Sequence, residues 1–185
     1  MKNKYFNTAR EAVDALVKDG DVIALAGVSS SCVAKELAFA TEERFLETGS
    51  PKNLTIMSTS APIDGINMFA HDGMCSRAIL GHFNSNKTFM QFVADNKCKC
   101  WNLPQGLLAI MYRSASAGEK GLLTKVGLGT FVDPRHQGGK SNEITTEDLV
   151  KVVEMDGEEY LWYTVTAPDV AFIRGSVADE KGNVS

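Results

Sequence analysis

Two short segments of the chain combine small residues with groups that can hold an anionic oxygen. Gly27-Val28-Ser29-Ser30-Ser31 follows an apolar run, and Pro104-Gln105-Gly106 follows Trp101-Asn102-Leu103. Small residues let a ligand approach the backbone, and a helix N-terminus directs free N–H groups at an anion. The Gln105 side chain carries an amide donor and a carbonyl acceptor, so at a strand end it can hold a carbonyl or carboxylate oxygen. A plain connecting turn at 27–31, and a Gln105 side chain that bonds its own backbone, are the open alternatives.

The other reactive residue types form no second motif of this kind. The three histidines are far apart and lack metal-ligand spacing, although Asp72 adjoins one of them; they are His71, His82 and His136. Each is therefore expected to be structural. Cys98 and Cys100 have no second pair of cysteines, which favours reduced thiols over a disulfide or a zinc site. The acidic pairs at 42–43 and 158–159 are expected on solvated faces. We expect no metal and no resident cofactor.

The predicted elements that flank these segments alternate regularly between helix and strand. A first helix is indicated by Thr8 as cap, by Glu11 three residues later and by apolar residues at helical spacing, with Gly20 as its stop. Further helices are predicted at 33–48, 63–70, 86–95 (capped by Ser85) and 106–116, and strands at 22–26, 53–58, 78–80, 99–103 and 122–126. This rhythm predicts an α/β fold with a mainly parallel sheet flanked by helices, and ligands bind at the carboxyl ends of such strands.

Beyond Gly127 the character of the sequence changes. Glycines crowd the stretch 127–139, which predicts a long structured loop. Strands at 150–155 and 158–165 flank Asp156-Gly157, a strong hairpin signal, and their aromatic residues are expected to pack. A further strand is predicted at 170–177 and a tight turn at 179–183. Because a turn normally leads into another element, we expect the chain to be a fragment or to be completed by a partner, with an unfinished sheet edge that favours association.

The composition excludes several classes of protein. The 185 residues include 19 Lys and Arg against 23 Asp and Glu, giving a net charge of −4, with 44% hydrophobic residues. This mildly acidic balance argues against a nucleic-acid or anionic-membrane partner. No run approaches the length of a membrane span, and no apolar stretch follows Lys2 and Lys4 as it would in a signal peptide. A cytoplasmic location is the expectation.

Several segments, taken in order, resemble the family I coenzyme A (CoA) transferases. The most specific is Gly127-Leu128-Gly129-Thr130-Phe131-Val132-Asp133-Pro134-Arg135 with Gly138-Gly139-Lys140 and Asn142. Supporting segments are 44–49 with 51–55, 69–73, 81–83, Pro104-Gln105-Gly106, 173–176 and 178–183. The similarity covers nearly the whole chain. It is greatest to the single-chain enzymes that transfer CoA between short-chain acyl groups and acetate or propionate.

The resemblance implies a covalent, ping-pong reaction. A glutamate attacks the acyl-CoA thioester, the CoA thiolate returns to give a glutamyl-CoA thioester, and an acceptor acid such as acetate then takes the CoA. The family has two similar α/β domains with the active site between them. Residues 1–185 would thus be the N-terminal part of the first, alpha-type domain, with the glutamate in a second domain or subunit absent from this chain. CoA would be a substrate, and a homo-oligomer is expected.

The resemblance also suggests roles for individual residues. Gln105 matches the family's Pro-Gln-Gly glutamine, which lines the active site and would donate to the reacting oxygen. The substrate-binding positions implied by the same match are Gly27, Ser29, Ser30, Ser31, Gly106, Gly129 and Thr130. The family's first loop usually has more glycines and ends in Pro-Glu, whereas this chain reads Ser29-Ser30-Ser31-Cys32-Val33-Ala34-Lys35.

Two other functions remain as alternatives. A half-site with an altered first loop could be a non-catalytic module that binds an acyl-CoA or a carboxylate without turnover. A sugar-phosphate isomerase of related fold would need a placed general base, and no residue of the sequence stands out as one.

Overall fold

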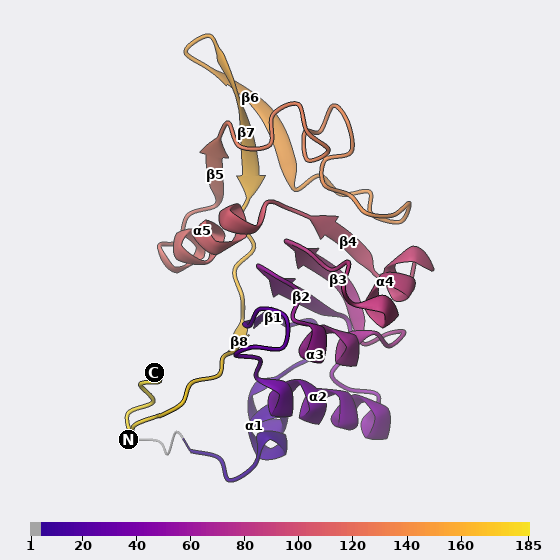
Figure 1. Cartoon of the computed structure of the whole chain (residues 1–185), viewed down its shortest axis with the longest axis vertical. Coiled ribbons are helices and arrows are strands. Elements are labelled where there is room, and N and C mark those ends of the chain that lie inside the picture. Colours follow the sequence, from indigo (N-terminus) through magenta and orange to yellow (C-terminus); the bar gives the residue numbers. More distant parts are fainter. Residues whose placement is uncertain (1–4) are drawn as a thin grey trace.

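The computed structural model describes residues 5–185, so Lys2 and Lys4, on which the argument against a signal peptide depends, lie outside the described residues. The chain forms a five-stranded parallel sheet and a separate three-stranded antiparallel sheet (Figure 1). The predicted α/β class, with a mainly parallel sheet and flanking helices, is confirmed. None of the described helices combines the length and apolarity needed to cross a lipid bilayer.

The parallel sheet holds the strands that the apolar runs predicted. Its strands are β1 (Val22–Leu25), β2 (Leu54–Ser58), β3 (Cys75–Leu80), β4 (Lys99–Asn102) and β8 (Val170–Phe172). Their order is β4-β3-β2-β1-β8, with β1 between β2 and β8. Because all five strands run in the same direction, their carboxyl ends meet at one edge of the sheet.

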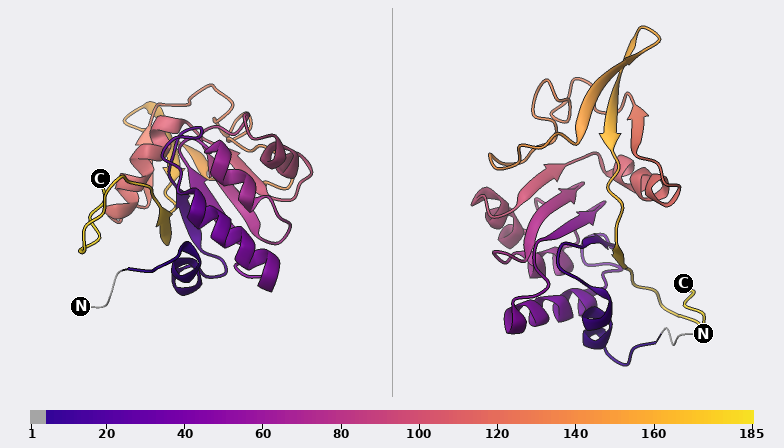
Figure 2. Two further views of the ribbon diagram at one scale, coloured as in Figure 1. Left: turned by 60° about the horizontal axis from the view of Figure 1, so that its bottom comes forward. Right: turned by 180° about the vertical axis from the view of Figure 1, so that it is seen from behind.

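Four helices cover one face of this sheet (Figures 1 and 2). They are α1 (Ala9–Leu16), α2 (Lys35–Thr48), α3 (Ile63–Ile66), which continues as a 3-10 turn at Asn67–Phe69, and α4 (Lys87–Ala94). Alternate strand residues, such as Ile23, Ile56 and Ala78, point into the core beneath them. The two-residue period of a strand sends the intervening residues to the opposite face.

The opposite face is covered by α5 (Gln105–Ser116) and by the antiparallel sheet, in which β7 (Glu158–Thr164) pairs with β5 (Gly121–Thr124) and with β6 (Val150–Met155). A second core forms here around Trp101, Met111 and Tyr163. The hairpin predicted at Asp156-Gly157 is confirmed, since both residues have positive φ. The strand predicted at 122–126 forms β5 of this antiparallel sheet, whereas the sequence pattern predicts it as part of the parallel sheet.

Three other local predictions were wrong. The strand expected at 170–177 ends at Phe172, and the segment after it makes a small hairpin in which Ala178 bridges Val184. Ser85 does not cap α4, because the residue before that helix is Asn86, and Asn67 instead accepts the N–H of Phe89 at 3.2 Å. The first helix ends at Leu16, before Gly20.

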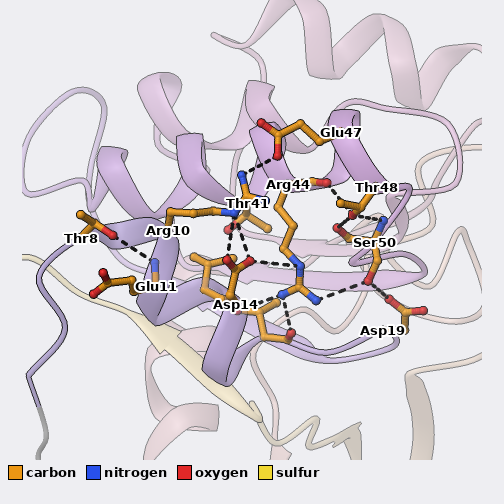
Figure 3. Close-up of polar contacts among 12 residues, drawn as sticks. Thr8, Arg10, Glu11, Asp14, Asp19, Thr41, Arg44, Glu47, Thr48 and Ser50 are labelled. Carbon is orange, nitrogen blue, oxygen red and sulfur yellow. Dashed lines mark hydrogen bonds and ion pairs between the residues drawn. The ribbon is translucent and has the colours of Figure 1, made fainter.

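Helices α1 and α2 are joined by a polar contact centred on Arg44 (Figure 3). Thr8 caps α1 as predicted, accepting the Glu11 N–H at 3.2 Å. The Arg44 guanidinium donates to the carbonyl oxygens of Val13 and Val17, each at 2.9 Å. Val17 directly follows α1, and the Val13 carbonyl also accepts the Val17 N–H at 3.0 Å, so Arg44 caps the C-terminal end of α1 from the neighbouring helix.

Candidate functional site

Two of the predicted site segments, the 27–31 turn after β1 and Gln105-Gly106 after β4, lie at the carboxyl edge of the parallel sheet. The Gly81 N–H donates to Ser58 O at 3.1 Å and the Leu103 N–H donates to Leu80 O at 2.9 Å, so the chain leaves β2, β3 and β4 side by side. A side chain at Gly81 would collide with the Thr59 carbonyl and would lie 3.1 Å from the Gln105 backbone and Cβ. Glycine at this position therefore lets Gln105 approach the strand ends closely.

Gln105 is the first residue of α5 and is exposed. No hydrogen bond of its side chain is found among residues 5–185, which argues against the alternative that it bonds its own backbone. The first helical bond is made by Leu107, whose N–H donates to Pro104 O at 3.0 Å, so the Gln105 and Gly106 N–H groups ahead of it are free of partners in the described chain. Three donors are thus available at the positive end of a helix, where a developing negative charge is stabilised.

The first loop is a tight turn held by its own backbone. Val28 and Ser31 exchange N–H···O bonds of 3.0 and 2.9 Å, and the Ser29 carbonyl accepts the Ile63 N–H at 2.9 Å. Gly27 has φ +122°, and a Cβ there would lie 2.9 Å from the Val33 side chain, so this turn requires glycine. The hydroxyl-bearing residues of the turn are exposed; they are Ser29, Ser30 and Ser31.

One cavity connects this turn with α5. It has a volume of about 610 Å³, and Gly27, Val28 and Thr59 line it together with Ala109 and Tyr112 of α5. Ala109 lies one helical turn beyond Gln105. Gln105 and the three serines do not line this cavity. The 27–31 turn and the start of α5 share one edge of the sheet because they follow β1 and β4 of the same parallel sheet, although they lie far apart in the sequence.

Gly129 and Thr130 belong to a loop that is organised around a buried carboxylate. Asp133 is fully buried and accepts the Gly129 N–H at 2.9 Å and two guanidinium bonds from Arg135, at 3.0 and 2.8 Å. The Arg135 guanidinium and the Gly129 N–H together hold the pKa of Asp133 far below its usual range. The Thr130 hydroxyl donates to Gly127 O at 2.7 Å. Both Gly129 and Thr130 are exposed.

This loop is anchored to strand β4. The Asn102 N–H donates to Gly139 O at 2.7 Å, and the Ser141 N–H donates to Cys100 O at 2.9 Å. The anchor lies just before Gln105 in the chain, but no hydrogen bond joins Thr130 to Gln105 within residues 5–185. The predicted positions thus form two groups. The 27–31 turn and Gln105-Gly106 share one edge, and Gly129-Thr130 lie on a neighbouring loop.

Reasoning from single residues missed several of the polar contacts. Arg135 reaches beyond Asp133 to Glu159 of β7 at 3.0 Å, so that carboxylate is paired rather than merely solvated. His71 lies 2.7 Å from Glu42, whose carboxylate is half-buried rather than on the solvated face expected for the 42–43 pair. Contacts across 24 and 29 residues leave no local signal in the sequence. For Asp133, the one sequence feature that indicated a role was its place in the Asp-Pro-Arg segment that resembles the family.

Comparison with known proteins identifies the family. The family model described as "Coenzyme A transferase" matches residues 6–185. The chain belongs to the coenzyme A transferase family. A curated relative, caffeate CoA-transferase of Acetobacterium woodii, is 42% identical over 184 residues, which are 97% of this chain and 35% of the relative. Acetate CoA-transferase YdiF of Escherichia coli K12 is 38% identical over 95% of this chain and 34% of its own length.

Solved structures of the family agree with the fold. The apoenzyme of YdiF from E. coli O157:H7 superposes with a TM-score of 0.91 at 38% identity, covering 96% of this chain and 35% of that one. Glutaconate CoA-transferase of Acidaminococcus fermentans gives a TM-score of 0.74 at 20% identity, which supports the fold alone. The chain spans about a third of the length of the first curated relatives it matches.

Proposed function

We propose that the protein acts in CoA transfer from a short-chain acyl-CoA to a carboxylic acid such as acetate. Gln105 carries this proposal, because its side-chain amide has no hydrogen-bond partner among residues 5–185 and it begins a helix at the carboxyl edge of the sheet. The names of the relatives, caffeate and acetate CoA-transferase, support the same class of reaction. Caffeate and acetate both carry a carboxylate group, so we propose a carboxylate as the acceptor. Acetate is the smaller of the two.

In the proposed reaction a glutamate outside this chain supplies the nucleophile. Its carboxylate attacks the thioester carbonyl, and the CoA thiolate leaves and then attacks the resulting anhydride, releasing the first acid and forming a glutamyl-CoA thioester. A second carboxylate reverses these steps and takes the CoA. Each attack places negative charge on a carbonyl oxygen. The Gln105 side-chain amide and the first N–H groups of α5 are placed to donate to that oxygen.

The two loops have separate roles in this proposal. The 27–31 turn, at the same edge of the sheet as Gln105, carries Gly27 and three exposed serine hydroxyls, and we expect these to bind the acyl end of the substrate. Gly129 and Thr130 would form another side of the substrate site, and the hydrogen bond from the Gly129 N–H to Asp133 fixes the conformation of their loop. A second subunit or domain brings the glutamate to this edge. A relative from Clostridium acetobutylicum, named as an alpha subunit of an acetoacetyl-CoA:acetate/butyrate CoA transferase, is 31% identical over 72% of its length and supports that division of labour.

Substitution of Gln105 in the full-length protein tests the proposal. We expect Gln105→Ala to lower kcat for acyl-CoA:acetate exchange by about 10²–10³-fold, the loss found when one oxyanion donor is removed. Gln91→Ala is the matched control, because Gln91 is exposed on α4 and its side chain donates to Asp95 at 2.7 Å, far from the sheet edge in the sequence. Unchanged kcat in Gln105→Ala would contradict the assigned role. Tight binding of an acyl-CoA by calorimetry, without turnover in the wild type, would instead favour the non-catalytic binding module.

A further inference from the structure

The loop between β3 and α4, residues 81–86, is fastened at both ends to its surroundings. The Gly81 N–H donates to Ser58 O at 3.1 Å. At the other end the Asn86 side chain, which is 1% exposed, donates to Ala61 O at 3.1 Å. Both acceptors belong to the end of β2 and the turn after it, so the loop holds a fixed position at the carboxyl edge of the parallel sheet.

His82, the second residue of this loop, is exposed and makes no hydrogen bond or ion pair among residues 5–185. His71, by contrast, lies 2.7 Å from Glu42. The structural role expected for each histidine is thus supported by a contact at position 71 but not at position 82. Because an imidazole ring carries an N–H donor, His82 can hydrogen-bond a ligand oxygen that reaches this edge of the sheet.

His82 lies close to Gln105, although α4 and β4 separate the two residues in the chain. A Cβ atom built on Gly81 would lie 3.1 Å from Gln105 Cα, and consecutive Cα atoms are ~3.8 Å apart. The Cα atoms of His82 and Gln105 are therefore within about 8.5 Å of each other. Since hydrogen bonds to a carboxylate are about 2.8 Å long, the imidazole and the unpartnered amide are long enough to reach the two oxygens of one carboxylate group.

The chemistry of the proposed reaction favours a binding role over a proton-transfer role for this histidine. Its nucleophiles are carboxylates and a thiolate, and its leaving groups are the same anions, so no step needs a general acid or a general base. An exposed imidazole at the reacting edge is then best suited to hold one oxygen of a carboxylate.

We propose that His82 binds the carboxylate of the acceptor acid and orients it beside Gln105. The inference rests on the proposed function and deepens it, because it names a residue that selects a carboxylate acceptor. His82 holds the acceptor before the reaction, whereas Gln105 stabilises charge that develops during the reaction. Loss of the first interaction therefore raises KM, and loss of the second lowers kcat.

Kinetics of the full-length protein separate these two roles. We expect His82→Ala to raise KM for acetate about tenfold, with kcat at saturating acetate within about threefold of the wild type, because a hydrogen bond to a charged group is lost. His82→Gln keeps an amide donor and should restore most of the affinity. Asn84→Ala, at an exposed position of the same loop, is the matched control and should leave KM unchanged. An unchanged KM in His82→Ala, or an equal rise in Asn84→Ala, would overturn the proposal.

A binding measurement without turnover separates this inference from the proposed function. The full-length protein is prepared with isotopically labelled histidine, and the ring NMR signal of His82 is identified by its absence from the His82→Gln spectrum. We expect acetate to shift this signal and sodium chloride at the same concentrations to leave it in place. A signal that ignores acetate, or responds equally to chloride, would overturn the role of His82 even if CoA transfer occurs. A specific response in a protein that transfers no CoA would support acceptor binding by His82 and overturn the proposed function alone.

Discussion

Among individual residues, Asp133 is a fully buried carboxylate. Its buried carboxylate accepts hydrogen bonds from the Arg135 guanidinium, from the Gly129 N–H and, at 3.0 Å, from the Arg135 backbone N–H. A buried charge is tolerated only when it is paired and hydrogen-bonded in this way. The 127–139 loop therefore depends on the ionised form of a single side chain.

This dependence predicts how stability changes with pH. The folded-state pKa of Asp133 lies below its unfolded value, so its contribution is complete above about pH 4 and is lost as the pH falls through the folded pKa. We expect Asp133→Asn to lower the free energy of unfolding by about 1–3 kcal/mol at neutral pH, because the amide keeps one acceptor oxygen and turns an NH2 donor toward the donors of Gly129 or Arg135 in place of the other. Urea unfolding measured from neutral to acid pH should show this difference shrinking below about pH 4.

Asp148→Asn is the matched control for that measurement. Asp148 pairs with Lys140 at 2.6 Å but is 60% exposed, and surface pairs contribute about 0–1 kcal/mol. A difference between wild type and Asp133→Asn that stays constant down to acid pH would contradict the ionic role of Asp133.

At the scale of elements, Arg44 links α1 to α2. Only 17% of its side chain is exposed, and it bonds two carbonyl oxygens of α1 while lying 3.5 Å from Asp14 (Figure 3). Helix α1 has eight residues, which is too short to be stable alone in water. Its position beside α2 therefore relies on this contact and on burial of Val13 and Val17.

Removal of the Arg44 guanidinium should loosen α1. We expect Arg44→Ala to lower the free energy of unfolding by about 1.5–3 kcal/mol, in the range for hydrogen bonds to a charged group. Amide hydrogen exchange should accelerate in residues 9–16 before it does so elsewhere. Arg113→Ala serves as the comparison, because Arg113 is exposed on α5 with no ion pair in the described chain. Equal effects of the two substitutions would show that the Arg44 hydrogen bonds contribute no more than an exposed arginine does.

The elements themselves were largely predictable because their signals are local. The Thr8 cap, the apolar runs of β1 and β2, and the Asp156-Gly157 turn each act within a few residues. The sheet to which β5 belongs was not predictable in this way. Its Gly121 lies under the Trp162 ring, where a side chain would collide, and the Tyr163 hydroxyl donates to Val126 O at 2.7 Å. These contacts span about forty residues and depend on the hairpin having formed.

At the scale of the whole molecule, the same limit applies to the site. The 27–31 turn and Gln105 could be predicted as strand-end segments, because each follows an apolar run. Their common edge follows from parallel pairing. The supporting glycine, Gly81, has no local signal, because its close approach to Thr59 and Gln105 exists only in the folded chain. Cytoplasmic location, a homo-oligomer and the absence of a cofactor stay predictions.

The most direct test of the central claim is the intact mass of the full-length protein after incubation with a short-chain acyl-CoA and no acceptor acid. CoA transfer through a glutamyl thioester predicts that the polypeptide gains the mass of CoA less one water, while the free acid is released. Addition of acetate should then remove that mass and yield acetyl-CoA. An unchanged protein mass together with intact acyl-CoA would contradict the account.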